Sequence, residues 1–343
     1  MKQLSREQLY AFLDAIASTE ALYLPVDNET GNASWQRYET GVTLSDKTNT
    51  ARSAKDFFFP QTESLVDFKL EGKRIEVIDV REECEDFVLF GVRACDAASF
   101  DILDRVYLHA DPVDSYYKNR REHGTVMTLA CSMPDETCFC ETFGIDATDP
   151  RGDVTVWALE DSFVLRANTE KGEALLARHA DLFTETDEKA VAAEQSRVRA
   201  IMAKLPLAGL STLGLGAGLT KELFNRPEWA SLSEACLGCG TCTFVCPTCQ
   251  CYDVRDFDTG HGIKRTRCWD SCMYSDFTKM AHGNPRTSQL ERFRQRFMHK
   301  LVYFPDNNDG IFGCVGCGRC LARCPISMNI VKVMKTMKGG TEQ

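Results

Sequence analysis

Residues 236–247 read CLGCGTCTFVCP, and residues 314–325 read CVGCGRCLARCP. Each cysteine of the first run recurs 78 positions later in the second run, and both runs follow the spacing C-x2-C-x2-C-x3-C-P. With this spacing, a tight loop presents three thiolates to three irons of a [4Fe–4S] cluster, and the fourth cysteine precedes proline. The repeat therefore predicts two such clusters in the last third of the chain.

In two-cluster ferredoxins the fourth cysteine of each run ligates the cluster of the other run, which brings the two clusters close together. The first cluster is accordingly assigned to Cys236, Cys239, Cys242 and Cys324. The second cluster is assigned to Cys314, Cys317, Cys320 and Cys246. Structural zinc is the competing interpretation, but zinc usually takes two separated C-x2-C pairs and has no use for three closely spaced ligands followed by C-P.

The composition is that of a soluble globular protein with many metal-binding thiols. The chain has 343 residues and 17 cysteines, an odd number gathered in clusters, which favours metal ligation in a reducing compartment over disulfides. Residues 1–20 lack the apolar core of a signal peptide, and no stretch is apolar enough for a membrane span, so we expect a cytoplasmic protein. A net charge of −10 and a pI near 5.2 argue against nucleic-acid binding.

The fold class expected is α+β, with an N-terminal α/β domain followed by a mainly helical ferredoxin-type dicluster domain. Strands are expected at 74–80, 87–92, 125–130, 154–158 and 163–167. Helices are expected at 3–18, at 96–107 and twice within 170–203. The predicted domains are 1–204 and 226–343, joined by a glycine-rich linker at 205–225, and the stretch between the two cysteine runs is expected to be largely helical.

Several further motifs extend over the chain. They are Phe58-Phe59-Pro60 with Glu63, Arg93-Ala-Cys95-Asp96, Cys138-Phe-Cys140, the segment Cys236–Cys251, Trp269-Asp-Ser-Cys272-Met273, and the run Arg294–Lys300. With them, nearly the whole chain resembles the β subunits of sulfhydrogenases and the A subunits of anaerobic sulfite reductases, which are cluster-bearing electron-transfer subunits. One segment departs from the family pattern, because Gly-Gly-His-Asn-Pro-Arg is altered to AHGNPR at 281–286.

The resemblance directs attention to a third [4Fe–4S] site. Its ligands would be Cys95, Cys131, Cys138 and Cys140, of which the first two follow predicted strands and the last three share one loop. The alternative is that these four thiols are small buried hydrophobic residues. A fourth site made of Cys249, Cys251, Cys268 and Cys272 is the weaker hypothesis, against packing or hydrogen bonding around the neighbouring cluster.

The function implied by the resemblance is that of a relay without substrate chemistry of its own. Such a subunit passes single electrons between a flavin-bearing, NAD(P)H-binding partner and a terminal reductase or hydrogenase subunit. The alternatives are an independently acting iron–sulfur oxidoreductase and a scaffold with structural clusters. The residues do not distinguish sulfite, protons, polysulfide or a disulfide as the terminal acceptor, nor NADH from NADPH.

Cations near the cysteines are expected to favour the reduced clusters, because a cluster with four thiolates is a dianion that gains a further charge on reduction. The run Arg286–Lys300 carries Arg292, Arg294, Arg296, His299 and Lys300 among apolar residues. Its alternative interpretation is an amphipathic helix with a solvated basic face. Arg319 lies inside the second cysteine loop and Arg323 precedes Cys324. These two arginines predict that the second cluster is the easier one to reduce.

Overall fold

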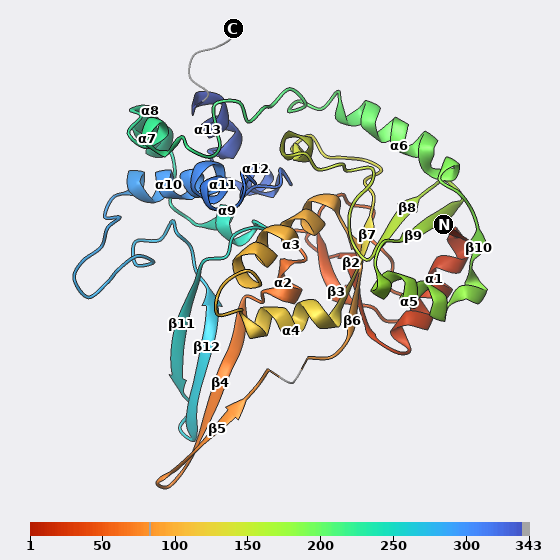
Figure 1. The fold of residues 1–343 in the computed structure, drawn as a ribbon, viewed down its shortest axis with the longest axis horizontal. Helices are drawn as coiled ribbons and strands as arrows, with labels where there is room; N and C mark the ends of the chain where they lie inside the picture. Colours follow the sequence, from red (N-terminus) through yellow and green to blue (C-terminus); the bar gives the residue numbers. More distant parts are fainter. Residues whose placement is uncertain (82–83, 338–343) are drawn as a thin grey trace.

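The computed structural model describes residues 1–81 and 84–337, which form an eight-stranded sheet, a four-stranded sheet and a layer of helices (Figure 1). Helices and strands are both abundant, and the cysteine-rich end of the chain is predominantly helical, so the α+β fold class is confirmed. Within the described ranges, none of the helices has the length and apolar character that crossing a membrane requires.

The eight-stranded sheet has the order β10-β1-β9-β8-β7-β6-β2-β3. Its strands are β1 (Lys2–Ser5), β2 (Ala21–Asp27), β3 (Ala33–Arg37), β6 (Phe87–Val92), β7 (Gly124–Leu129), β8 (Val154–Ala158), β9 (Ser162–Ala167) and β10 (Thr184–Glu185). The central strands β2, β6, β7 and β8 are parallel to one another, whereas antiparallel strands extend both edges. The carboxyl ends of β6 and β7 consequently lie side by side.

Helices cover both faces of this sheet, which explains why every residue of β6 is buried. Alternate side chains of β6 point to opposite faces. Val88 and Phe90 pack in one core with α1 (Arg6–Ala17) and α5 (Glu170–Arg178). Phe87 and Leu89 pack in another core with α2 (Lys55–Phe58), α3 (Ala94–Tyr107) and α4 (Ser115–His123). The remaining helices of this half are η1 (Cys140–Phe143), η2 (Ala180–Leu182) and α6 (Lys189–Met202).

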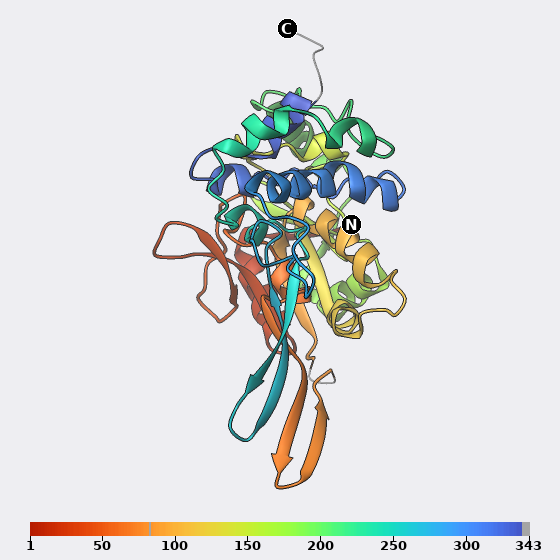
Figure 2. The same cartoon turned by 90° about the vertical axis from the view of Figure 1, so that its left-hand side faces the viewer.

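The four-stranded sheet joins two segments that are far apart in the sequence. Its order is β11-β12-β4-β5, formed by β4 (Thr62–Glu71), β5 (Arg74–Asp79), β11 (Tyr252–Asp258) and β12 (Gly262–Trp269). This antiparallel sheet projects from the body of the molecule in both views (Figures 1 and 2). Strands on either side of the predicted linker therefore belong to one sheet.

The C-terminal helices pack around a second apolar core. They are α7 (Thr220–Phe224), α8 (Glu228–Glu234), α9 (Thr241–Phe244), α10 (Gln289–Met298), the π-helix η3 (His299–Tyr303), α11 (Phe304–Asn307), α12 (Arg319–Arg323) and α13 (Ile330–Met337). A capping box of Ser288 and Glu291 begins α10. Helices α10, η3 and α11 follow one another without a break. This π-helix contains the buried Lys300. Such helices are rare in proteins overall, but those that occur are often found at functional sites.

Most predicted elements are confirmed, and two predictions are wrong. The helix expected at 3–18 begins only at Arg6, because Lys2–Ser5 form a strand between β9 and β10. The stretch between the cysteine runs, expected to be largely helical, begins instead with the hairpin β11–β12. Pairing of β12 with the distant β4 supplies backbone hydrogen bonds that local sequence preference does not report.

Candidate iron–sulfur centres

The loop of the second cysteine run packs directly against the loop that carries Cys138 and Cys140. The Phe139 N–H donates a hydrogen bond of 2.9 Å to the Gly316 carbonyl oxygen. Gly316 has a φ of +61°, and a Cβ atom there would lie 2.4 Å from the Phe139 carbonyl oxygen. Only glycine fits this contact, which brings cysteines from the two halves of the chain together.

A small cavity of about 20 Å³ lies inside the second run. Its cysteines are Cys314, Cys317, Cys320 and, from the first run, Cys246. The structure thus brings together all four residues assigned to the second cluster, including the one that crosses over. Their ligation of iron is still a prediction.

Two buried cations face these cysteines. Arg296 and Lys300 are 3% and 5% exposed, and both line the cavity. None of the described residues that line it carries a carboxylate. Arg296 donates to the Cys242 carbonyl oxygen, but its Nε and Nη1 have no hydrogen-bond partner among the described residues. Because a buried guanidinium requires a compensating anion, the cavity fits a negatively charged group such as a cluster with four thiolates.

The protonation of these groups reflects their mutual attraction. Burial opposes the charge of Lys300, yet the thiolates of Cys246 and Cys249 raise its pKa above the ordinary value. A hydrogen bond from the Cys249 side chain, assisted by Lys300, holds the pKa of Cys246 well below its usual range. Burial raises the pKa of Cys314 to about 12. A bound metal would displace the proton of such a thiol.

A second small cavity, of about 10 Å³, is lined by all four cysteines of the predicted third site: Cys95, Cys131, Cys138 and Cys140. Cys95 follows β6 and Cys131 follows β7, so adjacent parallel strands place these two cysteines together. Arg93 also lines this cavity, and no carboxylate does so among the described residues. Cys317 lines both cavities, which makes the two sites immediate neighbours.

The first cysteine run lies beside α10. Gln289 donates to the Cys236 carbonyl oxygen over 3.2 Å, and Arg296 donates to that of Cys242 over the same distance. Cys239 is exposed, unlike the cysteines of the two cavities. Cys324, at the end of α12, donates to the Met328 carbonyl oxygen, and its place in the first cluster stays a prediction.

Comparison with known proteins agrees with this arrangement. The profile of a family described as "4Fe-4S dicluster domain" matches residues 235–328. Sulfhydrogenase 2 subunit beta of Pyrococcus furiosus is 32% identical over 348 residues, which cover 98% of this chain and 98% of the relative. The chain belongs to the sulfhydrogenase β-subunit family. No solved structure matches it significantly.

Family membership confirms the resemblance and identifies the chain as an iron–sulfur electron-transfer protein with a [4Fe–4S] dicluster domain. The family motifs also include cysteines outside the two runs. Three of these, Cys249, Cys251 and Cys272, lie together beside Cys246: the Cys249 side chain is hydrogen-bonded to Cys246, and that of Cys251 to Cys272. The hydrogen bond from Cys272 lowers the pKa of Cys251 to about 7.

Cys268 does not join them. It precedes Trp269 in β12, so the two side chains point to opposite faces of the sheet. Trp269 faces the buried Lys55, whose Nζ is 3.5 Å from the ring centroid and donates to the Cys249 carbonyl oxygen over 2.9 Å. Within the described chain, the Cys268 side chain shares a hydrogen bond only with Thr266. The structure therefore does not gather the four cysteines of the weaker hypothesis.

Sequence reasoning missed Lys55 and the partner of Arg319 at this site. Lys55 is 1% exposed, and burial lowers its pKa to about 8, partly offset by Cys249 and Cys246. Its position three residues before Phe58 of a family motif was an available signal. Arg319 forms a buried ion pair with Asp96, which offsets its charge. That the second cluster is the easier one to reduce stays a prediction.

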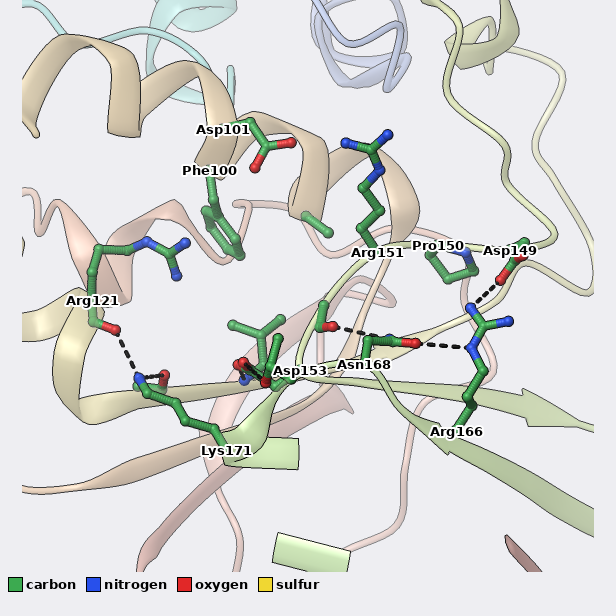
Figure 3. A pocket seen from close by; sticks show the side chains of 15 residues that line it. Phe100, Asp101, Arg121, Asp149, Pro150, Arg151, Asp153, Arg166, Asn168 and Lys171 are labelled. Atoms are coloured by element: carbon green, nitrogen blue, oxygen red, sulfur yellow. Dashed lines mark hydrogen bonds and ion pairs between the residues drawn. The ribbon is translucent and has the colours of Figure 1, made fainter. Parts of the chain in front are cut away.

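A separate polar pocket lies beside the amino ends of β7 and β8 (Figure 3). None of the described residues that line it is a cysteine. Arg166 forms an ion pair of 2.6 Å with Asp149, and Lys171 donates to three backbone carbonyl oxygens. These charged groups are satisfied by the protein itself. We assign no function to this pocket.

Proposed function

We propose that this chain relays single electrons between a flavin-bearing, NAD(P)H-binding subunit and a terminal reductase or hydrogenase subunit. The contact of the two cysteine-lined cavities at Cys317 carries this proposal, because electron transfer requires neighbouring redox centres. The relative's name describes a β subunit, which supports a multi-subunit assembly here. The reducing environment that free thiolates need supports a cytoplasmic location.

The cysteines proposed to bind the [4Fe–4S] clusters are those assigned from the sequence. Cys236, Cys239, Cys242 and Cys324 would bind one cluster, and Cys314, Cys317, Cys320 and Cys246 a second. Cys95, Cys131, Cys138 and Cys140 would bind a third. When bound, the clusters supply one-electron oxidation and reduction. The protein contributes thiolate ligands, glycine-containing loops and buried cations that stabilise added negative charge.

Arg296 and Lys300 tune the second site in this proposal. Their positive charges face Cys246 and Cys314 from one continuous helical segment. Because that site is shielded from water, the cations act in a medium of low polarity and favour the reduced state. A centre that is easily reduced suits the acceptance of electrons from a reduced flavin.

The test compares the native assembly with the isolated chain, both prepared anaerobically. NAD(P)H is expected to reduce the clusters, observed by electron paramagnetic resonance, in the assembly but not in the isolated chain. Chemical reductant should reduce both samples. Oxidation of NAD(P)H by the isolated chain, or reduction of sulfite or protons by it, would show that the chain acts independently.

A further inference from the structure

Cys251 and Cys272 form a thiol pair outside the three proposed cluster sites. Their side chains are hydrogen-bonded to each other, and the Cys272 backbone N–H also donates to the Cys251 sulfur. The β11–β12 ladder produces this proximity. Tyr252 is paired with Trp269, and the Asp270 N–H donates to the Cys251 carbonyl oxygen over 2.9 Å.

A tight turn then brings Cys272 back to Cys251. Ser271, which is fully buried, forms a hydrogen bond of 2.9 Å with Thr243 and accepts another from the Met273 N–H. Thr243 belongs to the first cysteine run. The turn is therefore fixed to a cluster-binding loop, and the mutual orientation of the two thiols is set by the fold.

The surroundings favour a thiolate at Cys251. Lys55 and Lys300 both interact favourably with its negative charge, and a thiol and an N–H donate to its sulfur. Thiolates stabilised in this way attack disulfides and are readily oxidised. Both cysteines are half-buried.

The contact between these sulfurs differs from that of the proposed cluster ligands. The ligand sets of the second and third sites line cavities, whereas the side chains of Cys251 and Cys272 are hydrogen-bonded to each other. Two thiols in contact suit the formation of a disulfide. Cys249 lies between this pair and Cys246, and is hydrogen-bonded to the latter.

We propose that Cys251 and Cys272 form a reversible disulfide that exchanges two electrons with the neighbouring cluster of the second run. In the reductive direction the sulfur–sulfur bond breaks, and two electrons and two protons yield two thiols. The electrons arrive one at a time from the reduced cluster, and the protons come from water. The inference rests on the proposed function, because the relay supplies the electrons. It adds a two-electron site to a chain of one-electron centres.

The experiment uses the anaerobically purified full chain and the variants Cys251→Ser, Cys272→Ser and Cys268→Ser. Cys268→Ser is the matched control, because Cys268 is a partly exposed cysteine of the adjoining strand β12, where its side chain is hydrogen-bonded to Thr266. Each protein is titrated with dithionite to count electrons, and its iron is measured. Peptide mapping after acid quench and alkylation identifies linked cysteines in the oxidised and reduced samples.

Wild type and Cys268→Ser are expected to take up about two electrons more per chain than the other two variants, at equal iron content. A peptide linking Cys251 to Cys272 should appear only in the oxidised samples. Equal electron counts with no linked peptide would overturn the proposal. So would a loss of about four irons in both Cys251→Ser and Cys272→Ser, since the pair would then ligate a further cluster. The two proposals can fail separately. Wild-type protein without iron would refute the proposed relay, whereas the peptide map tests the disulfide independently of the iron content.

Discussion

Arg319 forms a bidentate ion pair with Asp96, with Nη1–Oδ1 and Nη2–Oδ2 distances of 2.5 and 2.7 Å. Both residues are buried, and Arg319 also donates to the Thr50 carbonyl oxygen. Asp96 neighbours Cys95 of one cavity, and Arg319 neighbours Cys320 of the other. The pair therefore ties the second cysteine run to the first turn of α3 and neutralises its own charge.

Replacing Arg319 should destabilise the protein more than replacing the whole pair. Arg319→Gln leaves the Asp96 carboxylate buried without a partner, which costs about 3–5 kcal/mol. The double variant Arg319→Gln with Asp96→Asn removes both charges and should recover much of that loss. Thermal unfolding of the anaerobic proteins measures the effect. A double variant as unstable as the single one would contradict this account.

Removing a buried cation should make the second cluster harder to reduce. Arg296→Gln is expected to lower its midpoint potential by about 60 mV, which corresponds to a tenfold change in a one-electron equilibrium. Arg294→Gln is the matched control, because Arg294 lies on the same helix but packs on Phe224, with 3.7 Å between its guanidinium and the ring centroid. Redox titration followed by electron paramagnetic resonance measures both variants. Equal midpoint potentials of the second cluster in Arg296→Gln and Arg294→Gln would show that the charge of Arg296 is screened.

The contact at Gly316 should be intolerant of a side chain. Gly316→Ala would place a methyl group against the Phe139 backbone and should weaken iron binding in both cavities. Gly310→Ala is a control, since Gly310 also has a positive φ but nothing within 4 Å of the added Cβ. The control carries only the backbone cost of about 1–2 kcal/mol. Iron retention after mild heating distinguishes the two, and equal retention would argue against close packing at Gly316.

The third site predicts the iron content of the chain. Three clusters of four irons give about twelve irons per chain, and Cys138→Ser combined with Cys140→Ser should reduce this to about eight. The cavity that these cysteines line is separate from that of Cys314 and Cys320, so the signals of the other clusters should persist. Iron and acid-labile sulfide analysis provides the measurement. An unchanged iron content in the double variant would remove the third site.

The spacing of the two cysteine runs was sufficient to predict the dicluster domain, because three ligands of each cluster belong to one short loop. Hydrophobic patterns likewise predicted β6, β7 and α3, since these elements bury continuous or periodic apolar residues. Family motifs drew attention to Cys95 and Cys138. In each case the prediction depended on residues close together in the sequence or on motifs shared with a known family.

Only the tertiary structure decided which groups meet. The pairing of β12 with β4 and the ion pair of Arg319 with Asp96 join residues whose sequence neighbours give no sign of the partner. The sequence shows the charge of Arg319 but not its counterion, so the cation looks free in the cysteine run. Burial and pairing are properties of the packed chain, and they determine whether a charge acts on a cluster or is already neutralised.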